Sequence, residues 1–407
     1  MRIKLVILGI ITLLLGCKEQ PTNNSLKTGP WRGILMVKDQ KKLPFTFNLD
    51  IRADKYSMQI RNAEELIEVD EITTKGDSIT IKFPVFEGYI AGTFDSTRIR
   101  GVFIKESLDR IVPFRAEFGK NERFPGTGKA TSDISGVWET VFYPMEKDPY
   151  KAKGIFTQTG NLVTGTFRTA TGDYRYLEGV VEGDSLMIST FDGAHAFLFT
   201  AGIKDSTLSG KFYSGNHSLE TFEAKRNEGF ELPDADSLTF IKEGYERFEF
   251  AFPHSEGSLI TSDDARFTDK VLIIQIMGTW CPNCLDESKF LVEYLEKNPN
   301  EDLEVVALAF EYAKTEELAF KAINRLRERL GISYPILLAQ YGSSDKGKAN
   351  EKLPMLNRVL SYPTTIFIDK KGEVRKISTG FNGPATGQKY LDFKEDFHAL
   401  VSTLLSE

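Results

Sequence analysis

The stretch Val271-Leu-Ile-Ile-Gln-Ile-Met-Gly-Thr-Trp-Cys281-Pro-Asn-Cys284 decides how the C-terminal part of this chain folds. Its first seven residues form an almost unbroken apolar run, which is typical of a central strand in a sheet covered on both faces. Gly278 and Thr279 end the run, and Pro282 suits the first turn of a helix, where a missing N–H group has no partner to lose. The stretch therefore predicts a buried strand, a short turn, and a helix with Cys281 at its start and Cys284 one turn further on.

The predicted position of the two cysteines indicates redox chemistry. Free backbone N–H groups and the positive end of the helix dipole stabilise an anion at a helix N-terminus, so the thiol of Cys281 should ionise more readily than a free cysteine. The thiolate is the form that attacks a disulfide, and Cys284 is placed to attack the mixed disulfide that results. We predict Cys281 as the nucleophile and Cys284 as the resolving thiol.

Two other uses of the cysteine pair are weighed against this prediction. A structural zinc site needs two further Cys or His ligands, but the only other cysteine is Cys17 and the four histidines are scattered without ligand-like spacing. We therefore predict neither a metal nor a cofactor. An inert structural disulfide is the other alternative, and the order strand, Trp-Cys-Pro-x-Cys, helix favours a redox pair over it.

The motif Trp280-Cys281-Pro282-Asn283-Cys284, with Ser361-Tyr362-Pro363-Thr364-Thr365 downstream, resembles the thioredoxin superfamily. Glu287, three residues after the second cysteine, makes the chain most similar to the TlpA and ResA type. The resemblance covers residues 245–407 and implies an α/β thioredoxin-like domain. Members of this type are membrane-tethered, extracytoplasmic thiol-disulfide oxidoreductases.

The resemblance also implies a substrate-binding surface. In thioredoxin-like folds the proline that matches Pro363 is cis, and the residue before it faces the two cysteines. Here that residue is Tyr362, whose backbone would pair with an extended substrate strand. We therefore expect Trp280, Pro282, Tyr362 and Pro363 to bind the substrate; an ordinary trans turn proline at position 363 is the alternative.

Glu287 is the predicted acid–base group. It shares a helix face with Phe290 and Leu291, and a carboxylate buried there without a partner takes up a proton rather than stay charged. The resemblance implies that this group takes and returns the proton of Cys284. Thioredoxin itself uses a buried aspartate where this chain has Gln275, which cannot titrate. A solvated helix face is the alternative for Glu287.

The N-terminal residues predict export and anchoring. Arg2 and Lys4 precede an apolar run that is too short to span a bilayer comfortably, so residues 1–16 read as a signal peptide rather than a buried helix. The run ends in Leu-Leu-Gly-Cys17, which resembles a bacterial lipobox with Cys17 as the lipidated residue. We expect a cell-envelope lipoprotein that faces the periplasm, with residues 17–28 as the lipidated cysteine and a flexible tether.

An internal repeat organises the chain between the tether and the cysteine domain. A chain of 407 residues is too long for a single core, and short alternating apolar runs separated by turn residues predict β-strands. The matched segments are Gly29-Pro-Trp31 with Gly136-Val-Trp138, Gly76-Asp-Ser with Gly183-Asp-Ser, Asp95-Ser-Thr with Asp205-Ser-Thr, and Phe114-Arg-Ala116 with Phe222-Glu-Ala224.

The predicted fold class is multidomain, with two tandem antiparallel all-β domains, barrels or sandwiches, followed by the α/β thioredoxin-like domain. The domain boundaries that we predict are 29–123 for the first repeat, 124–132 for a linker, 133–227 for the second repeat, 228–244 for a second linker, and 245–407 for the last domain. Strand-spaced aromatic residues are expected to form core, with a ligand pocket as the alternative; they are Trp31, Trp138, Tyr174, Tyr176, Phe197 and Phe199.

The predicted function is a membrane-anchored extracytoplasmic thiol-disulfide oxidoreductase that reduces protein disulfides, takes electrons from a membrane thiol donor and serves cell redox homeostasis. The formal net charge of −7, with no basic stripe, excludes nucleic acid as a partner. Two alternatives remain. A thiol peroxidase of the alkyl-hydroperoxide-reductase type expects Thr or Ser where this chain has Gly278, and a non-catalytic binding or sensor module is the other.

Overall fold

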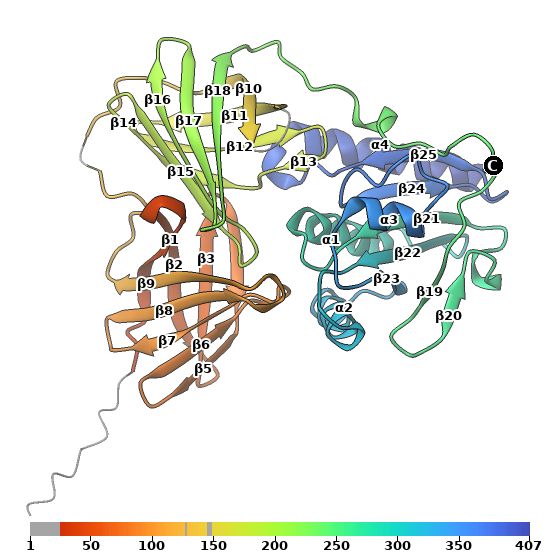
Figure 1. The fold of residues 1–407 in the computed structure, drawn as a ribbon, viewed down its shortest axis with the longest axis horizontal. Helices are drawn as coiled ribbons and strands as arrows, with labels where there is room; N and C mark the ends of the chain where they lie inside the picture. Colours follow the sequence, from red (N-terminus) through yellow and green to blue (C-terminus); the bar gives the residue numbers. More distant parts are fainter. Residues whose placement is uncertain (1–24, 127, 145–148) are drawn as a thin grey trace, which may run out of the picture.

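The structure is a computed structural model that describes residues 25–126, 128–144 and 149–407. Its N-terminal part is mostly β, with one nearly closed and one closed sheet, and its C-terminal part is thioredoxin-like (Figure 1). The predicted signal peptide and Cys17 lie outside the described residues. No helix among the residues that are described is long and apolar enough to cross a membrane.

The first sheet is an antiparallel meander in which the first and last strands pair with each other, so that the sheet curls into a nearly closed form. Its order is β4-β3-β2-β1-β9-β8-β7-β6-β5. The strands are β1 (Gly29–Met36), β2 (Lys42–Arg52), β3 (Lys55–Asn62), β4 (Glu65–Val69), β5 (Glu71–Lys75), β6 (Ser78–Lys82), β7 (Tyr89–Phe94), β8 (Arg98–Lys105) and β9 (Arg110–Phe118).

The second sheet has the same meander, and pairing of its second strand with its third closes it into a barrel. Its order is β11-β10-β18-β17-β16-β15-β14-β12-β13. The strands are β10 (Gly136–Pro144), β11 (Tyr150–Thr159), β12 (Leu162–Thr169), β13 (Gly172–Asp173), β14 (Leu177–Glu182), β15 (Ser185–Phe191), β16 (Ala196–Lys204), β17 (Thr207–Ser214) and β18 (Ser218–Arg226).

The repeated motifs occupy equivalent places in the two sheets. Trp31 in β1 and Trp138 in β10 are both fully buried, and each indole N–H donates to the carbonyl oxygen four residues earlier, at 2.9 and 2.8 Å. The matched phenylalanines Phe114 and Phe222 each stand opposite a glycine of the preceding strand. The sequence repeat is therefore a repeat of strand order and of core packing.

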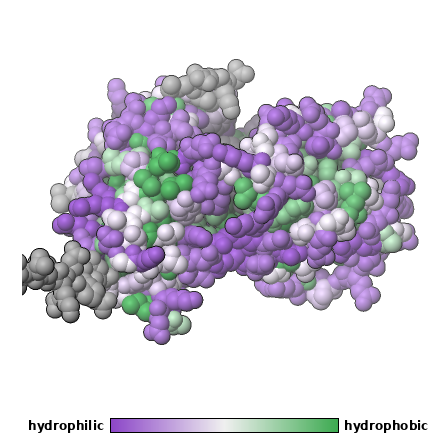
Figure 2. Space-filling view, turned by 60° about the horizontal axis from the view of Figure 1, so that its bottom comes forward, coloured by the Kyte–Doolittle hydropathy of each residue, from purple (hydrophilic) through white to green (hydrophobic). Residues whose placement is uncertain are grey.

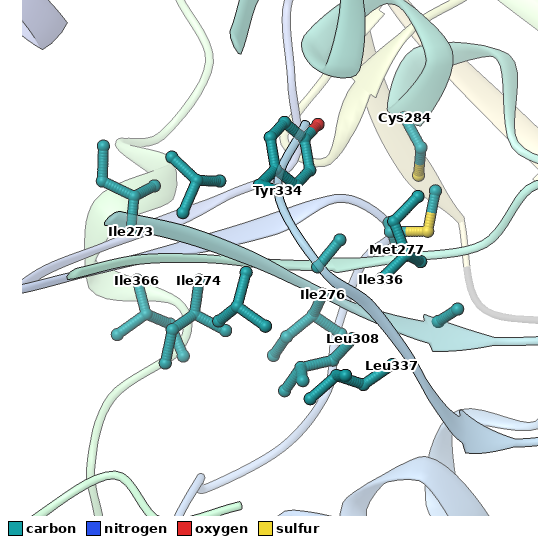
Figure 3. Packing of buried hydrophobic residues seen from close by; sticks show 14 of the residues in the cluster. Ile273, Ile274, Ile276, Met277, Cys284, Leu308, Tyr334, Ile336, Leu337 and Ile366 are labelled. Carbon is teal, nitrogen blue, oxygen red and sulfur yellow. The ribbon is translucent and has the colours of Figure 1, made fainter. Parts of the chain in front are cut away.

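The C-terminal part is built on a five-stranded sheet of order β23-β22-β21-β24-β25, with every residue of its central strand buried. Figure 3 shows how the apolar side chains of this strand interlock with those of the neighbouring strands. The elements are β21 (Val271–Met277), α1 (Pro282–Lys297), β22 (Leu303–Phe310), α2 (Glu316–Leu330), β23 (Ile336–Gln340), α3 (Lys346–Lys352), β24 (Thr364–Ile368), β25 (Val374–Thr379) and α4 (Gln388–Ser406), preceded by the separate hairpin β19 (Ala251–Pro253) and β20 (Leu259–Thr261).

In helix α2 the predicted caps are correct, but one residue predicted to be buried is exposed. The Thr315 hydroxyl accepts the N–H of Leu318 at 3.2 Å, and Gly331 ends the helix with a φ of 65°, as the capping pattern predicts. The spacing of Leu318, Ala319, Ile323 and Leu326 in the sequence predicts one apolar stripe, but Leu318 is 46% exposed. The buried stripe begins one residue later, at Ala319, and a step of one residue turns the side chain by about 100° around the helix.

The three sheets pack against one another through shared apolar and ionic contacts. Val85 and Phe86 of the first sheet's β6–β7 connection belong to the core of the C-terminal part, and Phe191 of the second sheet belongs to the core of the first. Arg325 of α2 donates to Glu71 at 2.7 Å. The outer face seen in Figure 2 is mostly hydrophilic, with hydrophobic side chains in small separate patches.

Candidate active site at the start of α1

The two cysteines lie where strand β21 passes into helix α1. Cys281 is the N-cap, and its sulfur accepts the N–H of Cys284 at 3.2 Å. Both thiols are free, but Cys281 retains 7% exposure whereas Cys284 has none. Cys284 turns toward Met277 and the interior of the sheet (Figure 3). An incoming molecule can therefore react with Cys281 first. Cys284 can react with it only after it is attached to Cys281.

The buried thiol of Cys284 needs a proton acceptor before it can react. Burial, together with the neighbouring sulfur of Cys281, raises the pKa of Cys284 well above its ordinary value. A thiol attacks a disulfide only as thiolate, so Cys284 requires a nearby group that takes its proton.

Glu287 is a candidate for that group. It is buried on the inner face of α1, where its two carboxyl oxygens accept hydrogen bonds from Gln275 at 2.8 Å and Thr365 at 2.6 Å. Burial raises its pKa to about 7 despite these two donors. The same Gln275 amide also reaches the carbonyl oxygen of Cys284 at 3.4 Å, which links the carboxyl group to the turn that carries the thiol.

The residues expected to bind substrate surround Cys281. The Tyr362–Pro363 peptide bond is cis, and the thiol of Cys281 donates to the carbonyl oxygen of Tyr362 at 3.4 Å. The indole N–H of Trp280 donates to the carbonyl oxygen of Phe310 at 2.9 Å, and its ring packs edge-on against Tyr362. The structure thus brings these residues, predicted from two distant motifs, to one place.

Glu311 is a second buried carboxyl group that the sequence analysis did not identify. It follows β22, and its two oxygens accept the N–H and the hydroxyl of Thr279 at 2.7 and 2.8 Å. Burial raises its pKa to about 7. A glutamate directly after an apolar strand, at the edge where the catalytic turn also lies, was the signal that could have found it.

The second sheet also reaches this site. Ser361 donates to the carbonyl oxygen of Thr171 at 2.9 Å, and Asn283, between the two cysteines, donates to that of Asp173 at 3.2 Å. Arg175 donates to the carbonyl oxygen of Pro282 at 3.0 Å. No local sequence pattern indicated these contacts, since they join residues more than a hundred positions apart.

A cavity of about 920 Å³ lies between the β-sheets and the C-terminal part, and Cys281 is in its wall. Of the aromatic residues expected to be core, Trp31, Trp138, Phe197 and Phe199 are buried in the sheet cores, and Phe197 also reaches this cavity. Tyr174 is half-buried and lines the cavity, whereas Tyr176 is half-buried outside it. Side chains from both N-terminal sheets and from loops of the C-terminal part complete the lining, among them Phe103, Lys105, Arg110, Tyr150, Trp280 and Tyr312.

Fold and dithiol together make the C-terminal part similar to the TlpA/ResA type of the thioredoxin superfamily, a class that includes thiol-disulfide oxidoreductases. Residues 233–391 match the Redoxin family model. The chain is 29% identical over 140 residues to the thioredoxin-like protein YneN of Bacillus subtilis, which covers 34% of this chain and 73% of YneN. It is also 27% identical over 114 residues to the thiol-disulfide oxidoreductase ResA of Geobacillus kaustophilus. This match covers 28% of this chain and 57% of that ResA.

Solved structures are similar over about two fifths of the chain. A thiol:disulfide interchange protein of the thioredoxin family from Chlorobium tepidum is 19% identical, with a TM-score of 0.30, and covers 40% of this chain and 98% of its own. A thiol-disulfide oxidoreductase from Bacteroides fragilis is 18% identical, with a TM-score of 0.27. The match covers 37% of this chain and 99% of that protein's chain.

Proposed function

We propose that the protein reduces disulfide bonds in other proteins, outside the cytoplasm, through the dithiol of Cys281 and Cys284. The observation that carries this proposal is the arrangement of a sulfur with slight exposure at the start of α1, a fully buried sulfur one turn further on, and a buried carboxyl group with a raised pKa whose charge acts on the buried sulfur.

The reaction follows from this arrangement. The thiolate of Cys281 attacks one sulfur of the substrate disulfide; the S–S bond breaks, and the departing substrate sulfur takes a proton. The ionised carboxylate of Glu287 then takes the proton of Cys284, whose thiolate attacks the sulfur of Cys281. The second substrate thiol leaves with the proton that Glu287 returns. The substrate gains two electrons, and the protein is left with a Cys281–Cys284 disulfide that an external dithiol must reduce.

The surrounding residues have positioning roles in this proposal. Tyr362, held by the cis bond to Pro363, presents its backbone beside Cys281 for an extended substrate chain. Trp280 and Pro282 shape the surface on either side of the attacking sulfur.

Gly278 supports reduction over peroxidase chemistry. A Cβ added at this position would collide with the indole nitrogen of Trp280, at a distance that Cβ atoms in proteins essentially never show. It would also lie 3.0 Å from the carbonyl oxygen of Phe310. The Thr or Ser that a thiol peroxidase requires at this position therefore has no room.

Anchoring and organisation complete the proposal. We propose that Cys17 is lipidated and holds the protein on a membrane of the cell envelope, where a membrane thiol donor restores the dithiol. The two repeats, 29–123 and 133–227, and the domain 245–407 are the proposed structural units. Replacing Cys17 with Ala should move the protein from the membrane fraction to the soluble fraction of the expressing cells; unchanged fractionation would contradict the anchor.

Reduction itself is tested with a short peptide closed by a disulfide and dithiothreitol as the electron source. The chain with Cys17→Ala retains two cysteines, so the assay reports on the dithiol alone. We expect turnover that is lost in Cys281→Ser and is retained in an exposed-surface control, Lys55→Ala. Equal turnover with and without Cys281 would contradict the proposal.

A further inference from the structure

One side of the dithiol is already occupied by the protein itself. The segment from Thr171 to Arg175, between β12 and β14, lies against the start of α1, where Asn283 donates to Asp173 and Arg175 donates to Pro282. Its Gly172 forms a parallel β-bridge with Phe381, and the carboxylate of Asp173 accepts the N–H of Gly383 at 2.6 Å. With the bonds to Ser361 and Asn283, this segment contacts three separate loops around Cys281.

Two glycines permit this close approach. A Cβ on Gly380, which has a φ of 79°, would collide with the backbone of Thr171. A Cβ on Gly172, which has a φ of 144°, would collide with the side chain of Asn283. Contact between backbones at this distance excludes any inserted chain, so the two surfaces leave no room for a substrate between them.

A buried ionic cluster fixes the segment in place. Arg175 is 3% exposed and forms ion pairs with Glu65 of the first sheet, Asp192 of the second, and Asp286 of α1. Burial alone would lower its pKa, but the three carboxylates raise the pKa of Arg175 well above its ordinary value. One guanidinium group thus ties both β-sheets to the helix that carries the cysteines.

The remaining approach to Cys281 is the cavity between the sheets and the C-terminal part. Its volume of about 920 Å³ is that of a pocket for a ligand or a short chain. A folded partner instead needs about 800 Å² of accessible surface on each side for a stable contact. Because Cys281 lies in the cavity wall with little exposure, a disulfide on a folded surface cannot reach it without displacing the segment 171–175.

We propose that the β-sheets act as a specificity filter, which admits disulfides on short extended peptide segments and excludes disulfides on folded protein surfaces. This rests on the proposed function, whose exchange steps and electron balance are unchanged. Segment 171–175 sets the selectivity by covering one side of the site, and Gly172 and Gly380 are its specificity-determining residues.

The test compares two substrates. One is an octapeptide closed by a disulfide between its terminal cysteines, and the other is insulin, whose disulfides belong to a folded two-chain protein. In wild type we expect the peptide to be reduced much faster than insulin. Gly380→Ala, which forces the segment away, should raise the insulin-to-peptide rate ratio by about tenfold, equal to about 1.4 kcal/mol in the relative barrier. Gly172→Ala is a second variant with the same expected direction.

Gly183→Ala is the matched control. Gly183 has a φ of 59°, so the substitution carries a similar backbone cost, but a Cβ there meets nothing within 4 Å. Its rate ratio should equal that of wild type. Equal reduction of insulin and peptide by wild type, or an unchanged ratio in both glycine variants, would overturn the filter and leave the proposed function standing. Reduction of neither substrate by wild type would overturn the proposed function and the filter with it.

Discussion

At the scale of single residues, the chemistry depends on a carboxyl group kept away from water. Glu287 has two hydrogen-bond donors and no cationic partner among the residues that the structure describes, so burial dominates and raises its pKa to about 7. A group with this pKa changes protonation readily near neutral pH, as proton exchange with Cys284 requires.

Glu287→Gln should slow reduction of the peptide disulfide by about a hundredfold, the lower range of general acid–base contributions. The amide keeps the shape of the carboxyl group, and its oxygen can still accept the bond from Gln275, but its NH2 group only donates, so the bond with Thr365 must reverse its direction. The amide cannot take a proton. The loss should fall on the release of the second substrate thiol, with first attack by Cys281 retained. Rapid-quench measurement of the mixed disulfide checks this; a variant with no accumulated mixed disulfide and full turnover would contradict it.

The same residue makes stability depend on pH. Its folded pKa of about 7 lies above the ordinary glutamate value of 4.5, so between these values the folded state binds the proton that the unfolded state has lost. Stability therefore falls as pH rises from about 4.5 to about 7, by roughly 3 kcal/mol for this group. Denaturant unfolding of Glu287→Gln should show a shallower decline than wild type. Glu311 titrates in the same range in both proteins, so parallel curves would contradict the assignment to Glu287.

At the scale of elements, the sequence predicted the C-terminal part well because its signals are local. The apolar run of β21, the proline at the start of α1 and the caps of α2 each lie within a few residues. Glu287 and Pro363 could be placed because both stand in short motifs. Leu318 was misplaced because an apolar residue beside a helical stripe satisfies the pattern without being buried.

Helix α2 offers a test of this local reasoning. Thr315→Ala removes the hydroxyl that accepts the N–H of Leu318, and should lower the free energy of unfolding by about 1 kcal/mol. Leu318→Ala, on the exposed face, should change it by less than about 0.5 kcal/mol. Urea titrations of both variants measure the difference. A larger loss in Leu318→Ala than in Thr315→Ala would show that the capping interaction has been misjudged.

At the scale of the whole molecule, the sequence could predict the repeat but not how the repeats meet the active site. The β-strands of the repeats followed from alternating runs and turn motifs, whereas the segment 171–175 docks through backbone groups and two glycines that carry no pattern of their own. The partners of Arg175 are equally unpredictable, because they come from three distant parts of the chain.

The ionic cluster predicts cooperative stability across the sheets. Arg175→Gln removes the cation that Glu65, Asp192 and Asp286 share and leaves Asp286 with the more exposed Lys289, so it should cost about 3–5 kcal/mol of unfolding free energy. Arg52→Gln is the control, since Arg52 pairs with Glu68 in an exposed bridge worth at most about 1 kcal/mol. Guanidinium unfolding at neutral pH compares the two. Equal, small losses would contradict the assignment of Arg175 as the tie between the sheets and α1.

The central claim is that Cys281 attacks first and Cys284 resolves, and a trapping measurement tests it most directly. The chain carrying Cys17→Ala and Cys284→Ser is mixed with the disulfide octapeptide, and the adduct is mapped by mass spectrometry. We predict a stable mixed disulfide on Cys281 in this chain. In the reciprocal variant, Cys17→Ala with Cys281→Ser, any adduct on Cys284 should form much more slowly. Adducts that form at equal rates on the two cysteines, or none on Cys281, would contradict the account.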